Sequence, residues 1–263
     1  MHSFDYAAPG TLKEAVGLLG GAGGAGRVLA GGTDLLINMR VGRRTPQLVV
    51  DAKRIPEVMQ YKLNGGLTLG AAVACHTVYN DEAVARAYPA LIDSATLIGG
   101  IQVQGRASIG GNLCNAAPSG DSIPTLIALG AVAQVQGPGG TREIPVDSFC
   151  TAPGQTALKP DELLVSIRIP APAAHSGAQY LRFIPRNEMD IAIAGAGVSV
   201  TLDAAGKTFT AARIALASVG PTPIFAKEAG DALVGKPVSE DSIRAAAEVA
   251  GAAAKPITDM RGT

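Results

Sequence analysis

The 263-residue sequence contains no tryptophan, and aromatic residues make up only 4% of it. Its charge is balanced, because 22 Lys and Arg residues match 22 Asp and Glu residues. Proteins that bind nucleic acid or an anionic membrane surface use an excess of positive charge, so we expect neither partner here.

Long apolar segments are also missing. No run of about 18 uncharged apolar residues could cross a bilayer, and the N-terminus has no basic segment followed by a long apolar one. We therefore expect a cytoplasmic protein without membrane insertion.

Cysteine and histidine are scarce, with three of each. Cys75, Cys114 and Cys150 are far apart and form no C-x-x-C pair, the spacing that zinc sites and iron–sulfur clusters often use. The histidines are isolated too, so we predict no metal site and no catalytic residue. Cys114 is interpreted as a small buried residue. If this protein carries electrons, the carrier is not a cysteine-bound metal.

Glycine, by contrast, is abundant, with 33 residues, which suits a backbone that must approach a bulky ligand. The length and the 47% hydrophobic content leave room for two domains. We place their boundary at Pro170-Ala-Pro172. The first domain is then residues 1–170, with parts of about 1–58 and 59–170, and the second is residues 173–263.

Hydrophobic patterning predicts an α+β protein. In the first part, Thr11-x-x-Glu14 predicts a capped helix, and the order of strands and helices is β-α-β. The second part is predicted to be rich in antiparallel strands, and the C-terminal domain is predicted to be an antiparallel sheet with helices. The predicted strands cover residues 27–30, 47–52, 67–73, 131–136, 142–145, 163–169, 179–184, 191–202 and 207–219. Helices are predicted from Leu35, over 122–129 and over 239–254, the last with Ile243, Ala246, Val249 and Ala250 on its apolar face.

Two glycine-rich stretches could bind phosphate. Ala30-Gly31-Gly32-Thr33-Asp34 lies between a predicted strand and a predicted helix, where free amides can hold a pyrophosphate without lysine. A tight structural turn explains that loop equally well. The second stretch, residues 98–115, is predicted to be one loop whose phosphate ligands are Ser108, Asn112 and the exposed amides of Gly110 and Gly111.

Two other features have competing interpretations. Asp121 could accept hydrogen bonds from ribose hydroxyls, cap the helix that follows it, or do both. Gly195-Ala-Gly197 lacks the third glycine of a dinucleotide fingerprint, so we interpret it as close strand packing.

The stretches AGGTDLL (30–36) and IQVQGRASIGGNLCNAAPSGD (101–121) resemble the paired FAD-binding motifs of the molybdenum hydroxylase flavoprotein family. Residues 4–15, 163–170, 186–192 and 259–262 resemble that family as well. Its members include the medium subunits of carbon monoxide and nicotinate-type dehydrogenases and the flavin domain of xanthine dehydrogenase. The resemblance implies a two-part, PCMH-like FAD-binding domain followed by the C-terminal domain.

The resemblance also implies which residues contact FAD. The pyrophosphate would lie on Ala30, Gly31, Gly32, Thr33, Asp34 and Leu35 and on Ser108, Ile109, Gly110, Gly111 and Asn112. Asp121 would lie toward the adenosine half, whereas Ile98, Leu164 and Arg182 would lie near the isoalloxazine. Ile98 stands where some relatives have an aromatic residue, and it could instead be a core strand residue. Arg182 could be an ordinary surface arginine.

By resemblance, the chain is an electron-transfer subunit. A large partner would hold the molybdenum cofactor, a small partner would hold 2Fe-2S clusters, and two such trimers would form a dimer. The substrate and the final acceptor, whether NAD, a quinone or oxygen, stay open. So do two alternatives: a self-contained FAD-dependent oxidoreductase and a flavin-free assembly scaffold. Relatives usually continue beyond the position of Thr263 into a final helix, so we expect a C-terminal domain that is short or trimmed.

Overall fold

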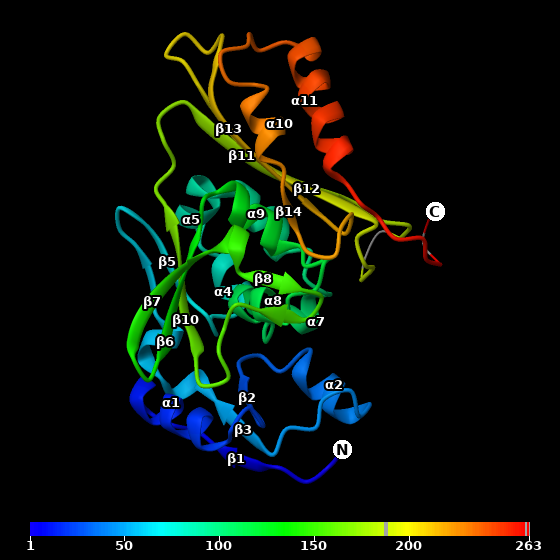
Figure 1. Ribbon diagram of the computed structural model, residues 1–263. Helices are drawn as coiled ribbons and strands as arrows, with labels where there is room; N and C mark the ends of the chain where they lie inside the picture. The colour runs from blue at the N-terminus through cyan, green and yellow to red at the C-terminus, as the bar shows by residue number, and fades with distance from the viewer. Residues whose placement is uncertain (187–188, 261, 263) are drawn as a thin grey trace.

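The computed structural model of the protein describes residues 1–186, 189–260 and 262. Asn187, Glu188 and Arg261, which belong to two of the motifs above, lie outside the described residues, as does Thr263. The three largest of the four sheets in the described residues follow one another through the molecule, from the N-terminal sheet at one end to the C-terminal sheet at the other (Figure 1). The expected α+β class is confirmed.

The N-terminal sheet is parallel, in the order β1-β3-β2. Its elements are β1 (Asp5–Ala7), α1 (Leu12–Gly21), β2 (Gly26–Leu29), α2 (Leu35–Arg40) and β3 (Leu48–Asp51). Thr11 caps α1, because its side-chain oxygen accepts from the Glu14 amide at 3.2 Å. The predicted β-α-β arrangement is therefore confirmed.

The middle sheet is antiparallel, in the order β4-β5-β10-β6-β7. Its strands are β4 (Tyr61–Leu63), β5 (Gly66–Gly70), β6 (Val132–Gly137), β7 (Gly140–Pro145) and β10 (Leu163–Pro170). The short elements around it are η1 (Ala52–Arg54), α3 (Pro56–Met59), η2 (Val146–Ser148), β8 (Cys150–Ala152) and β9 (Gln155–Thr156). One hydrophobic core runs from α1 and β3 through this sheet, so the first two sheets share their packing.

Between β5 and β6 the chain is helical, which the sequence analysis largely missed. The helices are α4 (Cys75–Tyr79), α5 (Glu82–Ala87), α6 (Pro89–Ala95), α7 (Ile101–Gln104), α8 (Ile109–Asn115) and α9 (Ser122–Ala128). The prediction that residues 98–115 form one loop is wrong, because α7 and α8 lie within them. The reason is packing: Ile109 and Leu113, four residues apart, are both fully buried and hold α8 in place.

The C-terminal sheet is an antiparallel meander, as predicted, in the order β11-β12-β13-β14. Its elements are β11 (Ser176–Phe183), β12 (Ala194–Leu202), β13 (Phe209–Ala217), β14 (Ile224–Phe225), α10 (Lys227–Asp231) and α11 (Glu240–Ala253). One face lies on α9: a Cβ added to Gly197 would be 2.7 Å from the Pro124 carbonyl carbon. This confirms close packing as the role of that glycine. The opposite face, with Val198 and Val200, packs with α10 and α11.

The predicted apolar face of α11 is partly wrong. Ala246 and Ala250 are buried against the sheet, but Ile243 is 53% exposed and Val249 is 37% exposed. Two small alanines let the helix approach closely, and the bulkier residues beside them point outward. Among the described residues, no helix is long and apolar enough to span a membrane.

A partly buried ion pair connects β7 to the start of β10. Arg142 donates to both carboxylate oxygens of Glu162, at 2.8 and 2.7 Å, and these bonds hold the pKa of Glu162 below its usual value. Because the pKa of Glu162 is lower in the folded protein than in the unfolded chain, the ion pair stabilises the fold fully above the unfolded-state pKa. This stabilisation is lost as pH falls through the folded-state pKa.

Arg142→Met is therefore expected to lower stability at neutral pH and to flatten its fall in acid. Urea unfolding midpoints measured between about pH 3 and pH 7 test this expectation. Arg86→Met is the matched control, because the Arg86 side chain is 76% exposed in its pair with Glu82. If the urea midpoint of Arg142→Met falls with pH as steeply as that of wild type, the Arg142–Glu162 pair does not link stability to pH.

Candidate functional site

A cavity of about 530 Å³ has walls that come from both the N-terminal and the middle parts of the chain. This volume is typical of small-molecule sites. The lining brings together most of the residues predicted from the two glycine-rich stretches and the flavin-proximal positions. Those residues are Ala30, Gly31, Gly32, Thr33, Asp34, Leu35, Ile98, Ser108, Gly110, Gly111, Asn112 and Leu164.

The two glycine-rich stretches touch each other at Gly31. A Cβ added there would lie only 1.8 Å from the Arg106 carbonyl oxygen, so no residue with a side chain fits without a shift. Arg106 in turn approaches the Gly31 carbonyl oxygen, with its Nε at 3.4 Å. Close backbone contact between the stretches thus fixes one wall of the cavity.

The first stretch presents free backbone donors. The amide nitrogens of residues 31–34 make no hydrogen bond to any residue that the structure describes. Gly32 has a φ of +78°, in the left-handed region that favours glycine. Residues 31–33 are half-buried and Asp34 is exposed, so these amides are open to solvent in front of α2. Four consecutive free donors beside a cavity can bind an anion.

The second stretch offers fewer amides than expected. Ser108 caps α8 by accepting from the Gly111 amide at 3.0 Å, so the prediction that this amide is exposed is wrong. The Ser108 hydroxyl hydrogen and the Gly110 amide have no acceptor among the described residues. Asn112 Oδ1 accepts from the Ser122 hydroxyl at 2.7 Å, and the Asn112 side-chain nitrogen has no acceptor among the described residues. Ile109 is fully buried in the core and is not part of the lining.

Leu164 and Ile98 reach the cavity from different elements. Leu164 lies on β10 at an irregularity in the pairing with β6, and such bulges redirect side chains. Ile98 is half-buried in a turn after α6, so the alternative that it is a core strand residue is wrong. Both side chains add to an apolar part of the lining that also includes Val58, Leu158 and Leu163.

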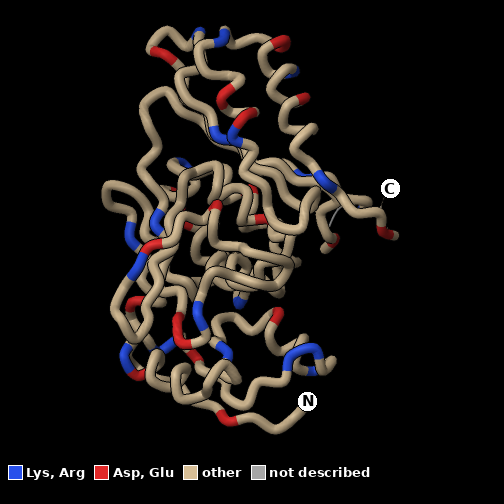
Figure 2. The backbone as a smooth tube through the Cα atoms, viewed as in Figure 1, with Lys and Arg blue, Asp and Glu red and all other residues tan. Residues whose placement is uncertain are grey.

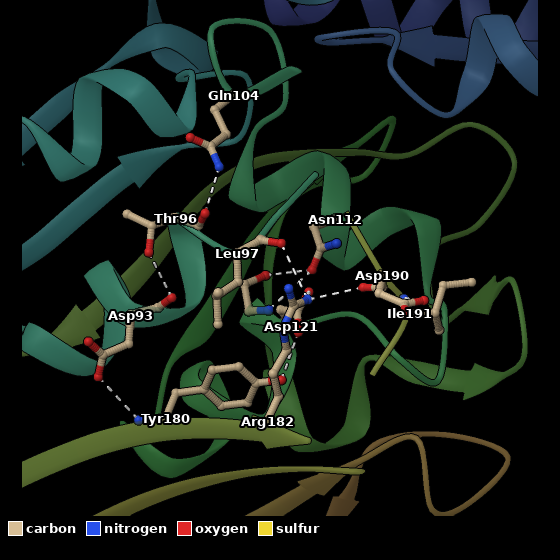
Figure 3. A network of polar contacts seen from close by, with 11 residues as sticks. Asp93, Thr96, Leu97, Gln104, Asn112, Asp121, Tyr180, Arg182, Asp190 and Ile191 are labelled. Atoms are coloured by element: carbon tan, nitrogen blue, oxygen red, sulfur yellow. Dashed lines mark hydrogen bonds and ion pairs between the residues drawn. The ribbon is translucent and has the colours of Figure 1, made fainter. Parts of the chain in front are cut away.

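Asp121 and Arg182 form a buried ion pair outside the cavity lining (Figure 3). Arg182 Nη1 is 3.0 Å from Asp121 Oδ2, and the Tyr180 hydroxyl donates to Asp121 Oδ1 at 2.9 Å. The Arg182 side chain is 4% exposed, so the alternative of a surface arginine is wrong. Asp121 occupies the N-cap position of α9, as predicted, but its side chain makes no cap bond, so its carboxylate does not cap the helix.

This pair lies next to the cavity through Leu97. Arg182 Nη1 is 3.4 Å from the carbonyl oxygen of Leu97, the residue before Ile98. The Arg182 Nε is buried and has no acceptor among the described residues. Burial raises the pKa of Asp121, and Arg182 and Tyr180 partly offset that shift. The guanidinium is therefore held in place through Nη1, while its buried Nε bonds to no described residue.

Sequence analysis missed three cations in the lining: Arg27, Arg44 and Lys159. None of them forms an ion pair with a described residue. Acidic and basic residues are spread along the whole chain (Figure 2), so composition gave no signal for this local excess. Burial and the nearby Arg44 lower the pKa of Arg27. The lining also contains the carboxylates Asp34 and Glu162, but Glu162 is paired with Arg142. The remaining positive charge favours an anionic ligand.

Cys114 also lines the cavity, and burial raises the pKa of its thiol to about 12. The thiol is therefore protonated at neutral pH and is a poor nucleophile. Within the part of the chain that the structure describes, no group of three or more His, Cys, Asp or Glu residues could hold a metal ion.

Comparison with known proteins agrees with this architecture. Residues 2–172 match the family described as FAD binding domain in molybdopterin dehydrogenase. Residues 179–263 match the CO dehydrogenase flavoprotein C-terminal domain. Together the two matches cover nearly the whole chain.

Individual relatives agree with the family matches. The carbon monoxide dehydrogenase medium chain of Hydrogenophaga pseudoflava is 34% identical over 260 residues, covering 98% of this chain and 90% of that protein. The xanthine dehydrogenase FAD-binding subunit of Escherichia coli O157:H7 is 32% identical, covering 93% and 85%. A solved carbon monoxide dehydrogenase structure from H. pseudoflava superposes with a TM-score of 0.94 at 35% identity, covering 100% and 91%. The chain therefore belongs to the family of FAD-binding medium subunits of molybdenum hydroxylases.

Proposed function

We propose that the cavity described above binds FAD and that its four free amides are the main pyrophosphate ligands. The observation that carries this proposal is the row of unpaired donors at residues 31–34, in a cavity that also contains three unpaired cations. A pyrophosphate is an anion with many acceptor oxygens, so it fits both features. The Ser108 hydroxyl, the Gly110 amide and the Asn112 side-chain nitrogen would supply further donors from α8.

We assign Asp121 and Arg182 to the same end of FAD. Groups joined at 3.0 Å cannot serve opposite halves of an extended dinucleotide, so the expectation that Asp121 faces the adenosine half is not retained. Their link to Leu97, beside Ile98, favours the isoalloxazine end. Arg182 does not line the cavity, so we assign it an electrostatic role beside the ring and no direct contact.

We further propose that the chain transfers electrons within a larger complex. Bound FAD would accept electrons from a 2Fe-2S partner subunit and deliver them to the final acceptor. A large partner would hold the molybdenum cofactor, and the complex would be a dimer of heterotrimers. The description of the relative in H. pseudoflava as a medium chain supports a division among several subunits. Arg182 would add positive charge beside the ring and so favour its reduced, anionic form.

The first test is an absorption spectrum of the purified chain, with the released cofactor identified by mass. Oxidised-flavin bands and released FAD are the expected result. A colourless protein that also refuses added FAD would favour the scaffold alternative. Substrate oxidation by the purified chain alone would favour the self-contained oxidoreductase. The unpaired amides and cations argue against the scaffold, because a scaffold needs no anion site.

A further inference from the structure

We propose that Lys53 is a positioning residue for the proposed FAD site, and that it aims the Gly31 amide into the cavity. Lys53 Nζ donates to the Ala30 carbonyl oxygen at 2.9 Å, across 23 positions of sequence. Ala30 and Gly31 line the cavity, whereas Lys53 does not. Lys53 therefore holds the first glycine-rich stretch from behind. This inference rests on the proposed function.

The ammonium group of Lys53 is itself fixed by Asp51, which Tyr6 holds in turn. It is 2.6 Å from Asp51 Oδ1, and the same oxygen accepts from the Lys53 amide at 3.0 Å. The Tyr6 hydroxyl donates to the other oxygen, Asp51 Oδ2, at 2.7 Å. Tyr6 is on β1, Asp51 ends β3 and Ala30 follows β2, so the chain of contacts connects all three strands of the N-terminal sheet.

The contact between Lys53 and the Ala30 carbonyl oxygen also sets the direction of the Gly31 N–H. The Ala30 carbonyl and the Gly31 amide belong to one trans peptide unit, in which the oxygen and the hydrogen point in opposite directions. Since Lys53 holds the oxygen on one side, the Gly31 N–H is turned to the other. That N–H has no acceptor among the described residues.

The charge of Lys53 adds to this effect. An ammonium bonded to a carbonyl oxygen draws electron density from the peptide unit, which makes its N–H a stronger donor. Asp51 keeps the ammonium from turning toward solvent, where 28% of the Lys53 side chain is exposed. The sequence alone could not assign this role, because Lys53 is 23 positions from Ala30.

The test compares FAD dissociation constants of full-length variants stripped of flavin, measured by flavin fluorescence. Lys53→Met keeps the length of the side chain but removes its charge and its donor. It is expected to weaken FAD binding roughly tenfold, in line with the loss of a charged hydrogen bond. Lys53→Arg is expected to restore most of the affinity, because it can still donate to Ala30 and pair with Asp51.

Two further variants separate positioning from general effects. Arg54→Met removes the same charge from the next residue, which is exposed and makes no hydrogen bond or ion pair with a described residue, and should bind FAD like wild type. Tyr6→Phe removes only the outer contact and should weaken binding by a smaller factor, without unfolding, because Tyr6 is 59% exposed. Urea midpoints are measured for every variant.

The outcomes distinguish this inference from the function on which it rests. Wild-type affinity in folded Lys53→Met, or equal loss in Lys53→Met and Arg54→Met, would overturn the positioning role alone. If wild type itself binds no FAD, the proposed function fails and this inference fails with it. If Lys53→Met does not fold, Tyr6→Phe becomes the deciding variant. Unchanged FAD affinity in Tyr6→Phe would then overturn the proposal that Tyr6, Asp51 and Lys53 position the Gly31 amide.

Discussion

Gly111→Val is expected to abolish FAD retention while the protein stays folded. Gly111 lines the cavity, and the atom nearest to an added Cβ is the side-chain oxygen of Ser108, at 2.9 Å. The branched side chain would therefore occupy space that we assign to the pyrophosphate. Displacing the Ser108 cap should cost about 1 kcal/mol of stability, which a folded domain of this size tolerates. Flavin occupancy of the purified variant measures the effect.

Gly110→Ala is the informative comparison, because a side chain added at this neighbouring glycine would point into protein and away from the cavity that its backbone lines. A Cβ there would lie 2.4 Å from the Ala71 carbonyl oxygen and 2.6 Å from the Ala71 Cα, and backbone atoms cannot move aside easily. This variant should lose stability, seen as a lower urea midpoint. If Gly111→Val keeps its full FAD content, the start of α8 does not contact the ligand and the second glycine-rich stretch is only structural.

The sequence predicted the outer parts of the fold better than the middle. Strands β11, β12 and β13 of the C-terminal meander are eight or nine residues long, and Thr11 with Glu14 gave a clear helix start. Residues 98–115 gave a misleading signal, because glycines and polar residues are typical of loops. Helices α7 and α8 exist there because Ile109 and Leu113 are buried, and burial is a property of the tertiary structure.

The candidate site was predictable where its residues are close in sequence. The glycine-rich stretches stood out as motifs, and the structure gathers them around one cavity. The polar network was not predictable, since Asp121 and Arg182 are 61 positions apart and contact each other only through the docking of β11. Arg27, Arg44 and Lys159 were missed because isolated basic residues in a neutral sequence are usually solvated surface residues.

Arg182→Met is expected to destabilise the protein by about 3–5 kcal/mol, the usual effect of removing one partner of a buried ion pair. The partner left behind, Asp121, is accessible to solvent over only 11% of its side chain. Its pKa is already raised by burial in the intact protein, and Arg182 is the main group that opposes the rise. Without the guanidinium, the carboxylate must either stay charged in a poorly solvated place or take up a proton.

The pH dependence of the stability loss tests whether the unpaired Asp121 carboxylate is its cause. Without Arg182, the pKa of Asp121 in the folded protein lies further above its value in the unfolded chain. Folded protein then binds the Asp121 proton more tightly than unfolded protein does. Stability is therefore retained in acid and is lost as pH rises from the unfolded-state pKa to the folded-state pKa. The defect in Arg182→Met should therefore be larger at pH 7 than at about pH 4, by urea unfolding. The double variant Asp121→Asn with Arg182→Met removes both charges and should recover much of the loss. An equal defect at both pH values would mean that Arg182 stabilises the protein through packing and its carbonyl contacts, because an uncharged role has no reason to depend on pH.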